Sequence, residues 1–150
     1  MPDPRKRKYL GVFYAHPSGD SPPKIEKERK ALELFLRERF HERMGAALAP
    51  AIYVISGRQE HKMGFFGDWE KWQRKVVKRK HATTGDICYH MFVVPGESCG
   101  RATAAILKLA FEEGRQVMLW DKDDNKLKRA KRVQAFDADD WTSGFRVTTE

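Results

Sequence analysis

The sequence has only two cysteines, and none of its apolar runs approaches the roughly 20 residues that a membrane-spanning helix needs. This excludes a disulfide framework, so Cys88 and Cys99 are expected to be free thiols in a reducing compartment. Residues 1–8 are basic and lack the apolar centre of a signal peptide. Together these absences predict a cytoplasmic protein with no membrane partner.

Signatures of ATP hydrolysis, hydride transfer and metal binding are also missing. The glycines form neither a P-loop nor a dinucleotide-binding fingerprint. His81, Cys88, His90 and Cys99 are potential metal ligands by type, but no Cys-x-x-Cys or His-Glu-x-x-His spacing occurs. We therefore expect neither a metal nor a cofactor.

Basic charge is plentiful: the formal net charge is +8, concentrated at residues 5–8, 74–81 and 126–132. Such a balance is compatible with nucleic acid, with anionic small molecules or with solubility alone. Acidic residues such as Glu113 and Asp121 alternate with the basic clusters along the chain. A nucleic-acid partner therefore stays open, with helix 73–81 as its candidate surface, but no continuous basic groove is predicted.

The hydrophobic pattern alternates between strands and helices. Apolar runs predict buried strands at 9–15, 51–55, 87–94 and 116–120, and helical periodicity predicts helices over 24–44, 68–77 and 98–113. Asp68 is the expected N-cap of the second helix, Gly45 and Gly114 end the first and third, and 56–67 is expected to be a loop.

This alternation predicts a single α/β domain over residues 9–150, preceded by a basic N-terminal arm at 1–8. The expected fold is a doubly wound, mainly parallel Rossmann-like sheet with helices on both faces. Residues 132–136 and 144–148 predict a short β-rich C-terminal extension, antiparallel at an edge. The oligomeric state is not determined by these patterns, and a homo-oligomer stays open.

The stretch 93–103 carries the strongest functional signal, because a buried strand breaks at Pro95-Gly96 and a helix follows. In open α/β sheets ligands bind outside the carboxyl ends of the strands, and the first turn of a helix favours anions. Loops after the first two strands should meet the same edge. The candidate ligand-binding residues are Tyr14, His16, Ser56, Gly57, Arg58, Asp68, Trp69, Gly96, Ser98, Cys99, Gly100, Arg101 and Thr103.

The order of these motifs is similar to that of a known superfamily. The motifs are the loop 13–19, Asp86 before the third strand, the turn Ser98-Cys99-Gly100, and 110–115 ahead of an apolar strand. The chain thereby resembles the Rossmann-like nucleoside 2-deoxyribosyltransferases, nucleotide N-glycosidases and related nucleotide sensors, and it is also similar to the DNA-processing A and lonely-guy phosphoribohydrolase folds. The resemblance implies a nucleotide or nucleoside ligand.

The chain departs from this superfamily at the catalytic position. The deoxyribosyltransferases have a glutamate in the helix after this turn. At that position this sequence has Ile106 when it is aligned on Ala110, and Ala104 when it is aligned on Ser98 and Gly100. Any N-glycosidase or deoxyribosyltransferase activity would then depend on Glu97, aided by Asp86 or Asp68. In the alternative, Glu97 or Ser98 only caps the helix and the protein is a non-catalytic nucleotide sensor.

Three further features have two interpretations each. Arg58 and Arg101 form a phosphate clamp or are merely exposed. Trp69 and Trp72 share one helix face, which favours core packing, although Trp69 could stack on a nucleobase. Cys99 at a helix N-terminus could have a lowered thiol pKa and act as a nucleophile, but no dedicated base accompanies it.

Overall fold

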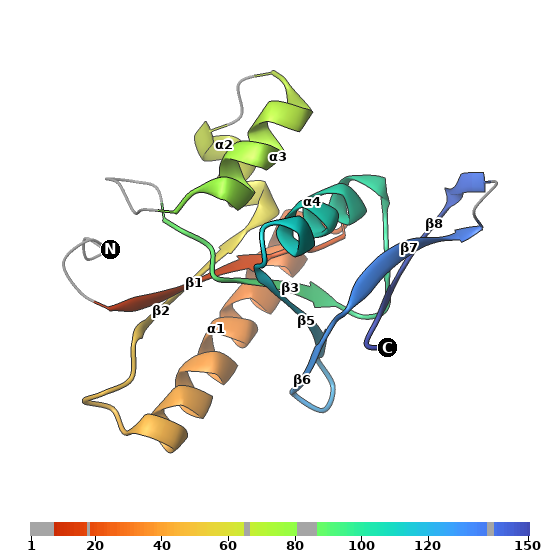
Figure 1. Ribbon diagram of the computed structural model, residues 1–150. Helices are drawn as coiled ribbons and strands as arrows, with labels where there is room; N and C mark the ends of the chain where they lie inside the picture. The colour runs from red at the N-terminus through yellow and green to blue at the C-terminus, as the bar shows by residue number, and fades with distance from the viewer. Residues whose placement is uncertain (1–7, 18, 65–66, 81–86, 138–139) are drawn as a thin grey trace.

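A five-stranded sheet forms the centre of the molecule, with strand order β2-β1-β3-β5-β6 (Figure 1). The computed structural model describes residues 8–17, 19–64, 67–80, 87–137 and 140–150. Strands β2, β1, β3 and β5 run parallel, and β6 is antiparallel to β5. The strands of this sheet are β1 Tyr9–Tyr14, β2 Ala51–Ser56, β3 Met91–Pro95, β5 Gln116–Asp121 and β6 Lys126–Arg129.

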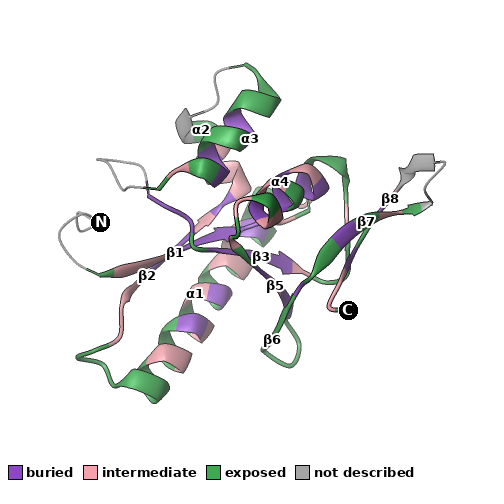
Figure 2. Cartoon of the chain, viewed as in Figure 1, coloured by how far each residue is buried: buried purple, intermediate pink, exposed green. Residues whose placement is uncertain are grey.

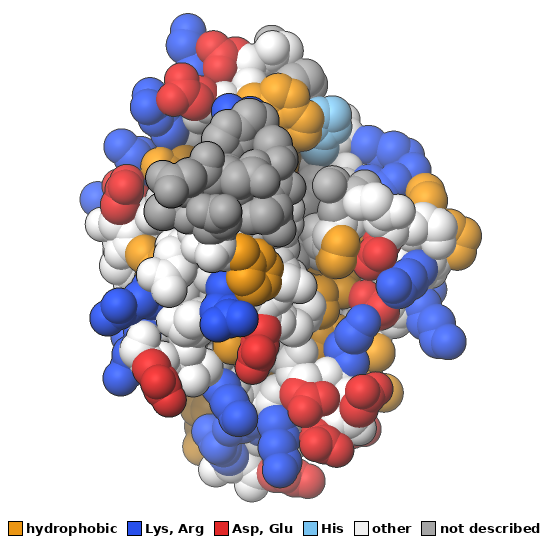
Figure 3. Space-filling view, turned by 90° about the vertical axis from the view of Figure 1, so that its right-hand side faces the viewer, with side chains coloured by type: hydrophobic (Ala, Val, Ile, Leu, Met, Phe, Trp, Pro, Cys, Tyr) orange, Lys and Arg blue, Asp and Glu red, His pale blue; other side chains and the backbone are white. Residues whose placement is uncertain are grey.

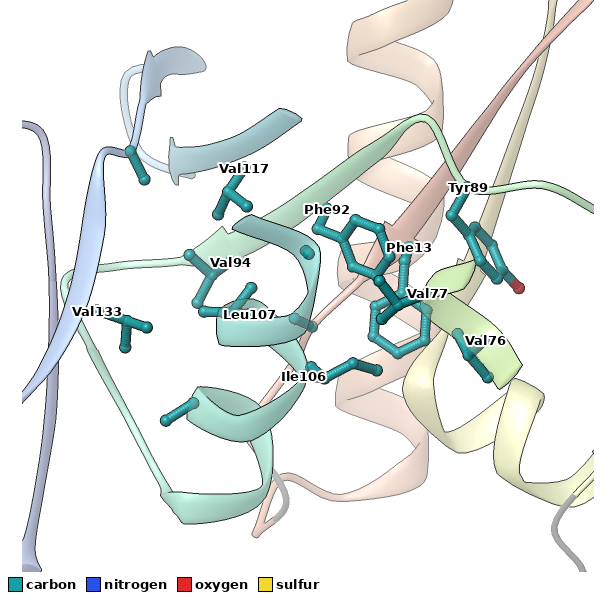
Figure 4. Packing of buried hydrophobic residues seen from close by; sticks show 14 of the residues in the cluster. Phe13, Val76, Val77, Tyr89, Phe92, Val94, Ile106, Leu107, Val117 and Val133 are labelled. Atoms are coloured by element: carbon teal, nitrogen blue, oxygen red, sulfur yellow. The ribbon is translucent and has the colours of Figure 1, made fainter. Parts of the chain in front are cut away.

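Helices cover both faces of this sheet. They are α1 Pro22–Met44, α2 Gly57–Gly64, α3 Trp69–Lys78 and α4 Arg101–Glu112. On one face Leu32 and Leu36 of α1 pack against β-strand side chains such as Val54. On the other, Val76 of α3 and Leu107 of α4 enter a second apolar cluster, part of which Figure 4 shows. The protein is therefore a mixed α/β structure with a mostly parallel sheet.

The C-terminal region forms a second, antiparallel sheet. Its strand order is β4-β8-β7, with β4 Ser98–Cys99, β7 Arg132–Asp137 and β8 Asp140–Thr148. The predicted antiparallel extension is confirmed, but it pairs with β4 instead of extending the edge of the main sheet. That edge is taken by β6, which the sequence did not predict. Val133, Phe145 and Val147 join the apolar cluster that contains α4.

Local signals define the bounds of α1. The Ser21 hydroxyl accepts from the Lys24 amide, prolines occupy the first turn, and Gly45 ends the helix with φ 78°. Its 23 residues extend about 34 Å, whereas a six-residue strand spans roughly 20 Å. The C-terminal end of α1 therefore projects beyond the sheet and is largely exposed (Figure 2). Met44, predicted to face the core, is 42% exposed.

The third predicted strand, 87–94, is wrong in its first half. The ladder begins at Met91, because the side chain of His90 occupies a backbone pairing position: its Nδ1 accepts from the Gly11 amide at 3.0 Å. The Cys88 amide donates to the Tyr9 hydroxyl at 3.0 Å. Gly11 is required here, because an added Cβ would lie 2.0 Å from the Cys88 carbonyl oxygen.

The helix predicted over 98–113 begins later than expected. Residues Ser98 and Cys99 pair with β8, and the Val147 amide donates to the Glu97 carbonyl at 2.7 Å. The N-cap of α4 is Gly100, which makes no side-chain capping bond. The capping of this helix by Glu97 or Ser98 is therefore wrong, because both residues bond to β8 and the helix begins after them. No helix in the described part of the chain combines the length and apolar character that crossing a bilayer requires.

Candidate functional site

A pocket of about 280 Å³ opens at the carboxyl ends of β1 and β2. β1 lies between β2 and β3. The chain therefore passes from β1 to the strand beside one of its edges and later returns to the strand beside its other edge. Such a reversal of strand order creates a crevice between diverging loops. The lining is contributed by the end of β1, the loop after it, and helices α1, α2, α3 and α4. The residues that line it are Phe13, Ala15, His16, Asp20, Ile25, Gly57, Arg58, His61, Trp69, Trp72, Gln73, Ala102, Thr103 and Ile106.

His16 organises the polar side of this pocket. Its Nε2 accepts from the Arg58 amide at 3.0 Å, so the ring proton lies on Nδ1, which is 2.9 Å from the Pro17 carbonyl. The Thr103 hydroxyl donates to the His16 carbonyl at 3.4 Å. Both ring nitrogens are therefore engaged, and His16 connects the β1 loop to α2 and α4 instead of serving as a free base.

Arg58 is positioned by a capping box at the start of α2. The Ser56 hydroxyl accepts from the Gln59 amide at 3.1 Å, and the Gln59 side chain accepts from the Ser56 amide at 3.0 Å. The expectation of a loop directly after β2 is thus wrong, and the Ser-x-x-Gln spacing was the missed signal. The Arg58 guanidinium forms no ion pair or hydrogen bond with a residue that the structure describes.

An aromatic wall closes another side of the pocket. His61 stacks on Trp69 with ring centroids 5.0 Å apart and an angle of 25°. Trp72 meets both rings edge to face. Trp72 is 4% exposed and belongs to the core, whereas Trp69 is 53% exposed and lies at the rim of the pocket. Such a wall suits a flat aromatic ligand.

The first turn of α4 contributes Ala102 and Thr103 to the lining. Gly100 offers no side chain to cap this turn, and the Gln73 side chain donates to the Ala102 carbonyl at 3.1 Å. The amides of a helix start carry partial positive charge and attract anions. Together with Arg58 they supply the positive charge of the pocket lining.

Asp20 and His61 were missed by sequence reasoning although they line the pocket. Asp20 follows β1, so the rule that loops after parallel strands converge would have included it. His61 was hidden because α2 was expected to be a loop. Of the predicted ligand-binding residues, those in the pocket lining are His16, Gly57, Arg58, Trp69 and Thr103.

The other predicted ligand-binding residues lie outside this lining. Tyr14 points to the α1 side, where its hydroxyl donates to Glu28. Burial and this hydrogen bond raise the pKa of Tyr14. Burial acts against ionisation of Glu28 too, yet hydrogen bonds from Tyr14 and Lys122 lower the pKa of Glu28 overall. Arg101 is the first residue of α4. The others serve as helix caps, turn or strand: Ser56, Asp68, Gly96, Ser98, Cys99 and Gly100.

Glu97 and Asp68, two of the carboxylates considered for catalysis, do not line the pocket. Glu97 lies beyond β3 and lines two other hollows, one beside Trp120 and Asp121 and one beside Arg132 and Arg146. Asp86 lies outside the described residues. Asp68 caps α3 by accepting from the Lys71 amide at 3.2 Å, which confirms the predicted N-cap.

Cysteine and metal chemistry find no support in the geometry. Burial raises the pKa of the Cys99 thiol to about 11, which is opposite to the lowering considered as one interpretation of this residue. The cause is that Cys99 belongs to β4, before the helix begins. Among the residues described, no cluster of three or more His, Cys, Asp or Glu side chains is placed to hold a metal ion.

The basic clusters differ in how they are neutralised. In the cluster at 74–81, Arg74, Lys78 and Arg79 pair with Glu70, Glu113 and Glu60. The cluster at 126–132 makes no ion pair with an acid that the structure describes. On the face turned toward the reader in Figure 3, basic and acidic side chains are interspersed. No single-sign surface covers that face.

Comparison of the chain with family models, with curated proteins and with solved structures finds no match. The functional interpretation therefore depends on the geometry of the pocket and on the chemistry of the residues around it.

Proposed function

We propose that the protein binds a nucleotide or nucleoside derivative in the pocket at the ends of β1 and β2. The observation that carries this proposal is one pocket that combines an aromatic wall, the Arg58 guanidinium and an uncapped helix start. The phosphate would lie between Arg58 and the first turn of α4, and the base would lie against His61 and Trp69. The strand order and the helices on both faces favour a doubly wound, Rossmann-like classification of the sheet.

The proposed activity is binding, as in a nucleotide sensor, and not N-glycoside cleavage or deoxyribosyl transfer. An oxocarbenium-like transition state needs a carboxylate directly at the anomeric carbon, a requirement that a carboxylate hydrogen-bonded to a sugar hydroxyl does not meet. Glu97 does not line the pocket, and Ile106, at the position where the related transferases have a glutamate, contributes an apolar side chain to it. The resemblance to that superfamily supports the ligand class more than the reaction.

Calorimetric titration with the four ribonucleoside 5′-monophosphates tests the proposal. We expect at least one of them to bind, and Arg58→Ala to weaken its binding by about 1.5–3 kcal/mol, because a hydrogen bond to a charged group is lost. Arg129→Ala is the matched control, since Arg129 is exposed on β6 and makes no ion pair with a described acid. Binding that is equal in the parent and in Arg58→Ala, or absent in the parent, would refute the proposed site.

A nucleic-acid-binding role is the second candidate, favoured by the cations of 126–132 that lack a described counter-ion. Binding of a single-stranded oligonucleotide that falls steeply with salt concentration would support it. Replacing Lys128 and Arg132 with glutamine should then reduce both the affinity and its salt dependence. If these substitutions leave mononucleotide binding unchanged, nucleotide binding belongs to the pocket and not to the cluster at 126–132.

A further inference from the structure

We propose that Asp20 binds a sugar hydroxyl of the ligand, so that the pocket selects ribosyl nucleotides over nucleotides that lack these hydroxyls. This inference rests on the proposed function, and it specifies which substrate class the pocket takes. The inference depends on Asp20, which belongs to neither apolar cluster and is not one of the candidate catalytic residues.

The carboxylate of Asp20 is only half satisfied within the protein. Its Oδ1 lies 3.3 Å from the ammonium of Lys24, in an i,i+4 pair whose Asp20 side chain is 15% exposed. Its Oδ2 is buried and accepts no hydrogen bond from any residue that the structure describes. A buried carboxylate oxygen without a donor is unfavourable, and because Asp20 lines the pocket, a small movement of its side chain toward a ligand donor would relieve this cost.

The chemistry of a carboxylate limits what that donor can be. An ionised carboxylate only accepts hydrogen bonds, so it repels a phosphate and attracts a hydroxyl or an amino group. Arg58, which lines the same pocket, has the opposite preference. The pocket therefore fits a ligand with an anionic end and a separate hydrogen-bond donor, which a nucleoside monophosphate supplies.

The position of Asp20 favours a sugar hydroxyl over an amino group of the base. Asp20 belongs to the short loop after β1, where its amide donates to the Pro17 carbonyl at 3.2 Å. His16 of that loop contacts the Arg58 amide, whereas the aromatic wall is built from α2 and α3. Asp20 belongs to the same loop as His16, whose ring bonds to the Arg58 amide, and in a nucleotide the sugar is the part bonded to the phosphate.

The size of the pocket agrees with a single nucleoside unit. Its volume of about 280 Å³ is near the lower end of the roughly 300–1,000 Å³ typical of small-molecule sites. Such a volume favours a mononucleotide over a dinucleotide cofactor. In a pocket of this volume each hydroxyl of the ligand lies close to a lining residue, so removing one hydroxyl removes its contact with that residue.

The test combines changes in the ligand with changes in the protein. Affinities for a ribonucleoside 5′-monophosphate and for its 2′-deoxy and 2′,3′-dideoxy counterparts are measured by calorimetry for the parent, Asp20→Ala and Asp20→Asn. We expect the parent to bind the ribonucleotide about ten- to a hundredfold more tightly than the dideoxy form. In Asp20→Ala the two affinities should agree within about twofold, because the acceptor is gone. Asp20→Asn, which preserves the shape, serves if the alanine variant fails to fold.

Asp123→Ala is the matched control, since Asp123 is exposed in the turn between β5 and β6 and should leave the discrimination unchanged. Equal affinity of the parent for ribo and dideoxy ligands would overturn the inference while leaving the proposed nucleotide site intact. Discrimination that survives in Asp20→Ala would overturn it as well. If the parent binds none of these nucleotides, both the inference and the proposed function are refuted.

Discussion

A buried ion pair between Glu60 and Arg79 joins α2 and α3, the two helices that carry the aromatic wall of the pocket. Glu60 lies on α2 with its side chain 3% exposed, and its carboxylate is 2.9 Å from the guanidinium of Arg79 beyond α3. The Tyr89 hydroxyl also donates to Glu60, and Arg79 donates to the Ile87 carbonyl at 2.9 Å. This cluster connects α2, the end of α3 and the segment before β3.

Glu60→Ala removes the acceptor of both bonds and leaves the buried Arg79 guanidinium without the Glu60 carboxylate. Removing one partner of a buried ion pair costs about 3–5 kcal/mol, because the desolvation of the other partner is no longer compensated. Typical domains are stable by only about 5–15 kcal/mol, so this loss is a large fraction of the total. Glu70→Ala, which breaks the exposed pair between Glu70 and Arg74, should cost less than about 1 kcal/mol.

The free energy of unfolding is measured by urea denaturation followed by circular dichroism, with linear extrapolation to water. The midpoint of Glu60→Ala should shift far below that of the parent at an unchanged slope. A loss in Glu60→Ala no larger than that in Glu70→Ala would refute the reasoning, since it would mean that burial does not amplify this interaction.

Three further predictions test the contacts around β3. Burial and the charge of Arg115 lower the pKa of His90, so the unfolded chain takes up the proton first and stability should fall as the pH drops through about 6.5. His90→Asn keeps an acceptor for the Gly11 amide and should flatten this part of the pH curve of urea midpoints; parallel curves would contradict it. Gly11→Ala should destabilise by about 3 kcal/mol or more in thermal unfolding, because its Cβ would meet the Cys88 carbonyl, and a loss below about 1 kcal/mol would contradict this. In a Cys88→Ser background, a disulfide reagent at pH 8 should modify Cys99 about a hundredfold more slowly than it modifies the unfolded protein, and equal rates would contradict burial of this thiol.

Much of the architecture was predictable because its signals are local. Ser21, Gly45 and Asp68 fix helix ends through bonds to neighbouring amides, so their meaning does not depend on the rest of the fold. The apolar runs of β1, β2 and β5 similarly predicted buried parallel strands, and the mixed α/β class is confirmed. The finer Rossmann-like classification stays a prediction.

The errors cluster where a distant segment competes for the same backbone groups. Ser98 and Cys99 follow a helical pattern, yet β8 lies almost 50 positions further along and pairs with them. His90 lies in an apolar run that predicts a strand, yet its ring Nδ1 accepts the hydrogen bond of the Gly11 amide in place of a backbone carbonyl. Neither competition is visible within a window of neighbouring residues.

The candidate site shows the same division. The sequence by itself determined that loops after parallel strands meet at one edge, which brought His16, Arg58 and Thr103 forward as candidates. Which of those loops share one pocket depended on the direction of each crossover and on the pairing of β4 with β8, and these placed Asp20 in the lining and Glu97 outside it. Hydrophobic period and caps are properties of a few consecutive residues, whereas a pocket is formed by segments whose proximity only the folded chain creates.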